Sequence, residues 1–260
     1  MKIYKIVLLT AATLVSSVSF GQLLERENVE SRIAVGTRPE AGDFGFMLGI
    51  SAQEIDEFSD SDLDTRGYPL MSFKYYLTDQ LELRLNSQIY EKSKKIQGDL
   101  VNTLGQEDNI DKESFYRFMP SVQYHFSSTN LLDTYAGAGI IIGAEKNEVL
   151  TSEKTTLTGD FIADQYTKST FVWGFNINFG VQAFIADLPL ALAVEASIRG
   201  LKHSNLQYEV NSKSSVGGVV TDQTFYTLSD DAELRYQSLE YKEFELGADL
   251  RFMLSYYFRR

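Results

Sequence analysis

The chain has 260 residues, no cysteine and a formal net charge of −12 at pH 7. The lack of cysteine excludes disulfides and a lipid-anchored cysteine, and the acidic balance argues against a nucleic-acid partner, because phosphate contacts need clustered lysine and arginine. The content of 15 Tyr, 17 Phe and only 4 Pro favours an all-β chain.

Residues 1–21 have the pattern of a secretory signal peptide. Lys2 and Lys5 precede an apolar run from residue 6 to residue 15, and small residues follow up to Gly21. The apolar run is too short for a membrane-spanning helix, which needs about 20 residues. We therefore expect a signal peptide over residues 1–21, a polar periplasmic leader over residues 22–42 and the folded domain over residues 43–260.

From residue 43 onward, eight runs of residues alternate between apolar and other side chains. In the last run the even positions are all apolar, whereas the odd positions include Glu245, Asp249 and Arg251. Successive side chains of a strand point to opposite faces, so each run predicts a strand with one apolar face. The predicted strands are residues 43–52, 70–77, 81–90, 115–126, 134–144, 171–184, 190–201 and 243–258.

The connections between these runs alternate between short and long. Residues 78–80, 127–132 and 186–189 are short links, whereas residues 53–69, 91–113, 145–168 and 202–240 are long and polar. Outer-membrane barrels have short periplasmic turns and long outer loops, and their tilted strands need about 9 to 11 residues to cross the bilayer. The sequence therefore predicts an all-β fold, a single eight-stranded antiparallel up-and-down transmembrane β-barrel, closed by pairing of its first and last strands.

Residues 133–140 read Asp-Thr-Tyr-Ala-Gly-Ala-Gly-Ile. This segment is similar to the Pro-Tyr-x-Gly-x-Gly strand openings of small OmpX/OmpW-type outer-membrane β-barrels of Bacteroidota, with Thr134 in place of the Pro. The resemblance covers essentially the whole mature chain. It implies location in the outer membrane of a Gram-negative bacterium, contact with outer-membrane lipid and lipopolysaccharide, and insertion by the barrel assembly machinery.

The end of the chain resembles the insertion signal that this machinery reads in the family. The family usually stops at the final aromatic residue, whereas two arginines, residues 259 and 260, follow it here. The residues that match the signal are Phe252, Leu254, Tyr256 and Phe258.

An eight-stranded barrel has an interior only just wide enough for its own side chains. Charges in such a lumen are costly unless opposite charges pair, so we expect a salt-bridged plug without an open pore, with a gated ion path as the alternative. Inward glycines on the first, fifth and sixth strands are expected to leave water pockets. The predicted lumen charge network is Lys74, Glu82, Arg84, Arg117, Glu195, Arg199, Glu245, Asp249 and Arg251.

His203-Ser204-Asn205 lies near the outer end of the seventh predicted strand. It is similar to the His-x-Ser-Asn motif of the lipid A deacylases, but here the histidine and serine are adjacent and so point to opposite faces unless a bulge intervenes. We therefore expect no catalytic residue and no enzymatic activity, and keep a lipid A-modifying hydrolase as an alternative. His125 is expected to cap the lumen near the periplasmic end.

The first long loop is the most acidic. Asp60, Asp62 and Asp64 have the every-second-residue spacing of a calcium loop, yet Thr65 stands where the sharp turn needs Gly and no Glu follows at the twelfth position. We expect solvation of this loop and neither a metal site nor a cofactor, with divalent cations shared with lipopolysaccharide phosphates as the alternative.

The longest loop, residues 202–240, contains segments that favour strand: 216–220, 224–228 and 232–239. They are expected to continue the seventh and eighth strands above the membrane as a hairpin, and residues 151–166 to extend the fifth and sixth. Exposed β-edges suit strand addition. The expected function is therefore protein interaction, as an accessory subunit of a larger outer-membrane complex or in adhesion, or a structural role; a narrow channel for small solutes is a further alternative.

Overall fold

The computed structural model describes residues 38–52, 55, 70–100, 105–126, 132–155, 159–185, 188–230 and 233–258. The chain divides into two units, Met1–Ala34 and Val35–Arg260, and the described residues all belong to the second. The predicted signal peptide, most of the predicted leader and the acidic residues Asp60, Asp62 and Asp64 lie outside the described residues. Within the described part, no helix has the length and apolar character needed to cross a membrane.

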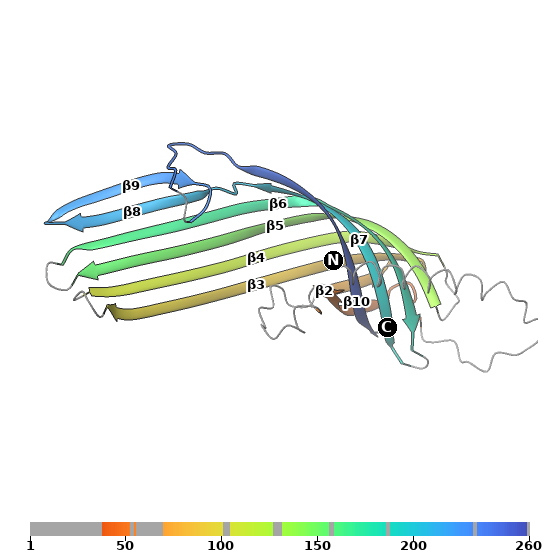
Figure 1. The fold of residues 1–260 in the computed structure, drawn as a ribbon. Coiled ribbons are helices and arrows are strands. Elements are labelled where there is room, and N and C mark those ends of the chain that lie inside the picture. The colour runs from red at the N-terminus through yellow and green to blue at the C-terminus, as the bar shows by residue number, and fades with distance from the viewer. Residues whose placement is uncertain are drawn as a thin grey trace, which may run out of the picture. The chain divides into compact units, whose positions relative to one another are not determined.

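Ten strands make up the described fold (Figure 1). They are β1 (Phe44–Ser51), β2 (Leu70–Tyr76), β3 (Leu81–Leu100), β4 (Gly105–His125), β5 (Leu132–Thr155), β6 (Phe161–Phe184), β7 (Leu190–Ser204), β8 (Tyr208–Val216), β9 (Val219–Thr227) and β10 (Lys242–Phe258).

Eight of these strands close into an antiparallel ring in the order β1, β2, β3, β4, β5, β6, β7 and β10. The ring closes where β1 pairs with β10, with Phe44 opposite Phe258 and Ser51 opposite Arg251. This is the closing pair that the sequence predicts. Closure leaves no unpaired strand edge within the ring, which is the topology of an up-and-down β-barrel.

The ring has its polar side chains inside and its apolar side chains outside. On β10, Asp249, Arg251 and Ser255 are buried, whereas Phe252 and Leu254 between them are 40% and 45% exposed. The other strands of the ring alternate in the same way. The arrangement is the reverse of a water-soluble sandwich, whose apolar face points inward.

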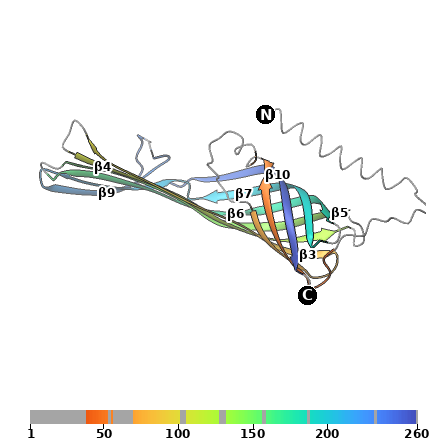
Figure 2. The same cartoon turned by 90° about the horizontal axis from the view of Figure 1, so that it is seen from below.

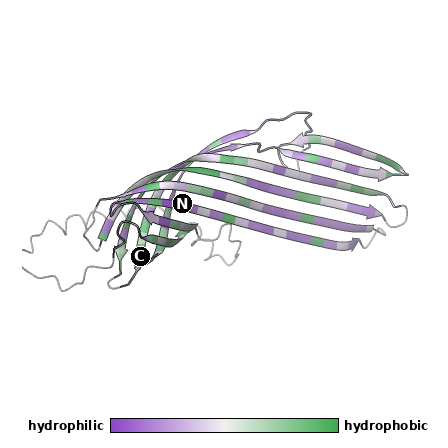
Figure 3. Ribbon diagram, turned by 180° about the vertical axis from the view of Figure 1, so that it is seen from behind, coloured by the Kyte–Doolittle hydropathy of each residue, from purple (hydrophilic) through white to green (hydrophobic). Residues whose placement is uncertain are grey.

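Four strands of the ring continue far beyond it (Figures 1 and 2). The part beyond the ring, here called the extension, consists of residues 91–100, 105–114, 145–155 and 161–169 together with β8 and β9. Most of its residues are hydrophilic (Figure 3). The predicted prolongation of the fifth and sixth strands is present, and Val149 pairs with both Asp111 and Tyr166.

Two predicted loops are wrong in detail. Residues 91–113 are mostly strand, with Lys92 opposite Glu113 and Lys94 opposite Asp111. Their charges lie on both faces, so they lack the apolar alternation that reveals the other strands. Residues 208–227 form a separate hairpin that pairs with β6 and does not prolong β7 or β10. Between residues 233 and 239, the pairing is a single bridge from Tyr236 to Tyr226.

Candidate functional site

The half of the ring interior next to the short β2–β3 turn, here called the lower half, holds a buried charge network. The opposite end, toward the extension, is here called the upper opening. The Nε of Arg84 donates a hydrogen bond to Oε1 of Glu82 at 2.7 Å, and its Nη1 donates to Oε2 of Glu195 at 2.6 Å. The Lys74 ammonium lies 3.7 Å from Glu82 Oε2. These four residues, here called the lower network, come from β2, β3 and β7 and are no more than 5% exposed. Each carboxylate therefore has a cation beside it, which offsets the cost of its burial.

Neutral polar groups complete the hydrogen bonding around Glu195. The Tyr135 hydroxyl donates to Glu195 Oε2 at 2.9 Å, and the Asn178 amide donates to the same oxygen at 3.0 Å. The Asn178 amide also donates to Gln123 Oε1 at 2.7 Å. The Arg84 guanidinium lies 5.1 Å from the centre of the Tyr135 ring, in a cation–π contact. A buried network of this kind is stable only when its members have partners, and the two oxygens that bind Arg84 have them, whereas Lys74 Nζ and Arg84 Nη2 make no hydrogen bond among the described residues.

The inward glycines do not leave the predicted water pockets. A Cβ at Gly180 would overlap the ring of Tyr135, and one at Gly137 would overlap the side chain of Gln123. The Gly45 position faces the ring of Tyr257, with 3.0 Å from a Cβ there to the nearest ring carbon. The expectation of water pockets was wrong because side-chain and backbone atoms of neighbouring strands occupy the space beside these glycines.

His125 closes the lower end of the interior, as the sequence suggests. Its Nδ1 lies 2.6 Å from Asp133 Oδ2, and its Nε2 lies 3.2 Å from Glu82 Oε2. Arg38, which precedes β1, lies with its Nη2 3.3 Å from Asp133 Oδ2. Sequence reasoning missed Arg38 and Asp133. Asp133 has the same inward parity as Tyr135 and could have been found from it, whereas nothing in the polar leader distinguishes Arg38.

An apolar layer lies between the lower network and the upper opening of the ring. It is a cluster of five buried side chains from β2, β4, β5, β6 and β7: Leu70, Met119, Ile141, Val172 and Leu201. On β4 the inward positions run from Gln123 in the lower half through Met119 to Arg117 at the opening. The predicted single charge network is thus two separate polar groups.

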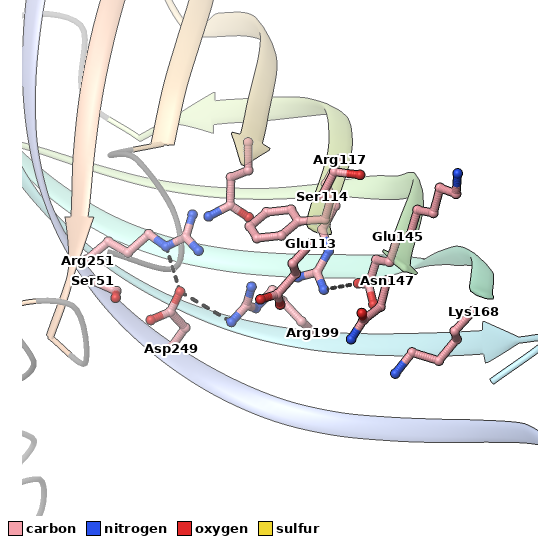
Figure 4. A pocket seen from close by; sticks show the side chains of 13 residues that line it. Ser51, Glu113, Ser114, Arg117, Glu145, Asn147, Lys168, Arg199, Asp249 and Arg251 are labelled. Atoms are coloured by element: carbon pink, nitrogen blue, oxygen red, sulfur yellow. Dashed lines mark hydrogen bonds and ion pairs between the residues drawn. The ribbon is translucent and has the colours of Figure 1, made fainter. Parts of the chain in front are cut away.

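The second group lines a pocket at the upper opening, here called the mouth pocket (Figure 4). Its volume is about 320 Å³. Arg251 Nε donates to Asp249 Oδ2 at 2.6 Å, and Arg199 Nη2 lies 3.5 Å from the same oxygen. The lining residues are Ser51, Gln88, Glu113, Ser114, Phe115, Arg117, Glu145, Lys146, Asn147, Lys168, Arg199, Asp249 and Arg251.

Further charges reach the mouth pocket from the extension. Arg117 forms an ion pair with Glu145, and the Lys168 ammonium lies 5.1 Å from the centre of the Tyr208 ring. The Lys146 ammonium lies 3.0 Å from Glu148, and this hydrogen bond lowers the pKa of the Glu148 carboxyl. Sequence reasoning missed Glu145, Lys146 and Lys168 because it treated residues 145–168 as a loop.

Glu245 does not join either group. Its side chain is 65% exposed, and its carboxylate lies 3.9 Å from His203 Nε2 near the end of β7. It shares the inward parity of Asp249 but lies beyond the enclosed part of the ring.

The His203-Ser204 pair lies in a regular strand. Both residues keep the register with β6 and β10, with His203 opposite Val172 and Glu243, and Ser204 opposite Phe171 and Lys242. Without a bulge the two side chains point to opposite faces, so the imidazole is not placed to activate the Ser204 hydroxyl. Among the described residues, no group of His, Asp and Glu side chains could hold a metal ion.

The four residues that match the insertion signal lie on the outer face of the ring. Phe252, Leu254, Tyr256 and Phe258 are 40% to 55% exposed, at the end of β10 that pairs with β1.

Comparison with known proteins adds little to the site. No protein-family model and no curated protein sequence matches the chain. Among solved structures, the chain is similar to CarO2 of Acinetobacter baumannii, with 12% sequence identity and a TM-score of 0.33, over 85% of this chain and 100% of that chain. A similarity of this size assigns neither a family nor a function.

Proposed function

We propose that this protein is an integral outer-membrane β-barrel with a filled lumen, of the OmpX/OmpW type found in Bacteroidota, and that it acts through binding at its outer end and not through catalysis. The observation that carries the proposal is the inverted ring. Phe175, Ile177 and Phe179 follow one another on the outer face of β6, each more than 40% exposed. A contiguous apolar surface around a whole ring is unfavourable in water, whereas lipid covers it without cost.

The backbone supports the same environment. Inside a bilayer every peptide group needs a partner within the protein, and a closed ring supplies one for each. The inward charges also fit, because Glu82, Arg84 and Glu195 are paired with one another and shielded from lipid by the ring itself. An open sheet with the same residues would satisfy neither requirement.

Aromatic side chains mark the two borders of the proposed membrane zone. At the end with the short turns, Phe44 and Tyr75 lie 4.8 Å apart between ring centroids, and Tyr256 and Phe258 lie 4.9 Å apart. At the other end, Trp173 pairs across β6 and β7 with Lys202, whose ammonium lies 5.7 Å from the indole ring. Such girdles lie at both membrane–water interfaces of outer-membrane barrels.

The loop lengths set the orientation within this proposal. The short β2–β3 turn lies at the same end of the ring as the start of β1 and the end of β10, and that end faces the periplasm. The extension then stands on the outer surface of the cell.

An arginine on the outer face tests the membrane location. Ile177 lies near the middle of the ring on β6, and Ile162 lies on the same strand in the extension; both are exposed, at 41% and 52%. Ile177→Arg should cost about 2 to 4 kcal/mol in the free energy of folding into lipid vesicles, whereas Ile162→Arg should cost well below 1 kcal/mol. Urea titration of vesicle-inserted protein measures both. Equal effects of the two variants would refute the proposal.

A second role, interaction with a protein partner, is favoured by the open edges of the extension. Among the described strands, residues 91–99 of β3 pair with β4 alone, and residues 219–225 of β9 pair with β8 alone. The β9 edge carries Val219 and Val220, both 69% exposed. A strand from a partner could pair with this edge.

The partner role is tested by purification from the native membrane in mild detergent. A protein that co-purifies in fixed ratio with the wild type and is lost from the Val220→Pro variant supports strand addition at β9, because proline cannot donate a ladder hydrogen bond. Val220→Thr, at the same position but with its backbone N–H kept, serves as the control substitution. If the chain purifies without any partner, the partner role is contradicted, and a structural role in the envelope is the function that remains.

A further inference from the structure

The mouth pocket carries positive charge in a strongly acidic protein. Its lining has five basic side chains, Arg117, Lys146, Lys168, Arg199 and Arg251, and three acidic ones, Glu113, Glu145 and Asp249. The whole chain has a net charge of −12. The local excess of basic residues is therefore opposite in sign to the field of the protein as a whole, which favours an anion in this pocket over a cation.

Ion pairs around the pocket offset only part of this excess, since Lys146 bonds to Glu148, which lies outside the lining, at 3.0 Å. Asp249 serves two guanidiniums, since its Oδ2 lies 2.6 Å from Arg251 Nε and 3.5 Å from Arg199 Nη2. One carboxylate is therefore shared between two guanidiniums. Lys168 has no ion pair among the described residues, and its described contact is with the neutral ring of Tyr208.

Two buried polar atoms in the lining also lack a hydrogen bond among the described residues. They are Nε of Arg117 and Oδ1 of Asn147. An unpaired buried donor costs free energy, and a bound acceptor would remove that cost. The Nε of Arg117 therefore gives the pocket a donor for an anion that is independent of the count of charges.

The pocket is built on strands, with its floor formed by packed side chains. Arg117 lies on β4, Arg199 on β7, and Asp249 and Arg251 on β10, and the apolar layer around Met119 lies below them. A guanidinium matches the oxygens of a carboxylate or phosphate with two parallel hydrogen bonds. The volume of about 320 Å³ lies within the range of small-molecule sites.

We propose that the mouth pocket binds a small water-soluble anion that carries carboxylate or phosphate groups. The pocket lies where the interior of the ring opens toward the extension, and residues 113–114, 145–147 and 168 of the extension complete its lining, so a soluble anion can reach it from the aqueous side. Arg199 and Arg117 bind its oxygens, and Lys168 adds a charge at the rim. The proposal concerns the inside of the ring and does not depend on the membrane location of its outside.

Calorimetry on the full chain in a zwitterionic detergent tests the site. Citrate, glucose 6-phosphate and inorganic phosphate are the soluble probes, glucose is the neutral control, and detergent micelles doped with lipid A present phosphate from a lipid source. We expect binding of at least one soluble anion, no binding of glucose, and weaker binding at higher salt.

Two substitutions locate the binding. Lys168→Gln and Arg199→Gln should each weaken it by about tenfold or more, because the first removes a positive charge at the rim and the second a charge-assisted hydrogen bond to the anion. Lys154→Gln, an exposed change on the extension outside the pocket, should leave the affinity unchanged. Lys168 lies at the rim, so this variant keeps the test valid if Arg199→Gln fails to fold. Absence of binding by every soluble anion, binding of lipid A micelles alone, or equal affinity of Lys168→Gln and Lys154→Gln would each overturn the proposal.

Discussion

The ring of Tyr135 covers Gly180 of the neighbouring strand β6, in the place where a side chain at residue 180 would lie. This contact brings the Tyr135 hydroxyl within 2.9 Å of Glu195. We expect Gly180→Ala to push the aromatic ring of Tyr135 away from Glu195 and to lower the free energy of unfolding by about 1 to 3 kcal/mol, the usual cost of overpacking. Urea unfolding followed by tryptophan fluorescence measures the change.

Gly98→Ala is the matched control for this prediction. Gly98 lies in the extension, is exposed, and a Cβ there would have no atom within 4 Å. Its substitution should leave the unfolding midpoint of the ring unchanged. If Gly180→Ala were equally harmless, Tyr135 would not be held by its contact with residue 180.

Removal of the Glu195 carboxylate should destabilise the lower network. It accepts hydrogen bonds from Arg84, Tyr135 and Asn178, so its removal leaves a buried guanidinium short of a counter-charge. Glu195→Ala should lower the free energy of unfolding by about 3 to 5 kcal/mol. Urea unfolding in detergent micelles measures the loss, with Glu153→Ala on the exposed part of the extension as the control.

The double variant Arg84→Met with Glu195→Met tests the cause. If the cost of the single change comes from the unpaired guanidinium, removal of both charges should cost less than the sum of the two single changes. Strict additivity would mean that the two residues stabilise the ring through packing and not through their pairing.

The alternation of apolar residues was enough to predict the ring, but not which charges meet inside it. On β10 the apolar residues from Phe252 to Phe258 at even positions predict the outward face. The odd-numbered Asp249 and Arg251 must then point inward. Arg84 and Glu195, in contrast, come from β3 and β7, which are not neighbours in the ring. Their contact depends on the stagger of the strands around the interior, which no single strand pattern contains.

The mouth pocket was hidden for a different reason. Lys146 lies just after the alternating run 134–144 and Lys168 just before the run 171–184, so their segments looked like a loop. Pairing with neighbouring strands holds both in β-structure, since Lys146 lies opposite Ser114 and Ser169, and Lys168 lies opposite Asn147. Local sequence carries only a weak signal for such tertiary pairing.

The filled interior should prevent steady ion flow. The lower network and the apolar layer around Met119 both cross the lumen, and the space beside the inward glycines is occupied. We expect no steady single-channel conductance after insertion of the purified protein into planar bilayers, with a flotation assay on vesicles as the control for insertion. Regular unitary currents that persist in independent preparations would show a conducting path and contradict the plug.

The β8–β9 hairpin should depend on its two-residue glycine turn. Gly217 and Gly218 have φ values of 59° and 83°, a backbone conformation that residues other than Gly and Asn rarely adopt. The Gly217 N–H also donates to Asp160 Oδ1 at 2.9 Å, which ties the hairpin to the turn between β5 and β6. Gly218→Val should strain the turn by about 1 to 2 kcal/mol and speed amide hydrogen exchange in residues 208–227.

Gly217→Asn is the control for this hairpin, because Asn tolerates a positive φ and keeps the N–H that Asp160 accepts. Exchange in β8 and β9 should then stay close to the wild-type rate. The amides of β1 and β10 should keep their protection in both variants, since these strands pair with each other and with β2 and β7, not with the hairpin. Faster exchange throughout the ring would mean that the extension and the ring unfold as one cooperative unit, and a partner bound at β9 would then stabilise the whole protein.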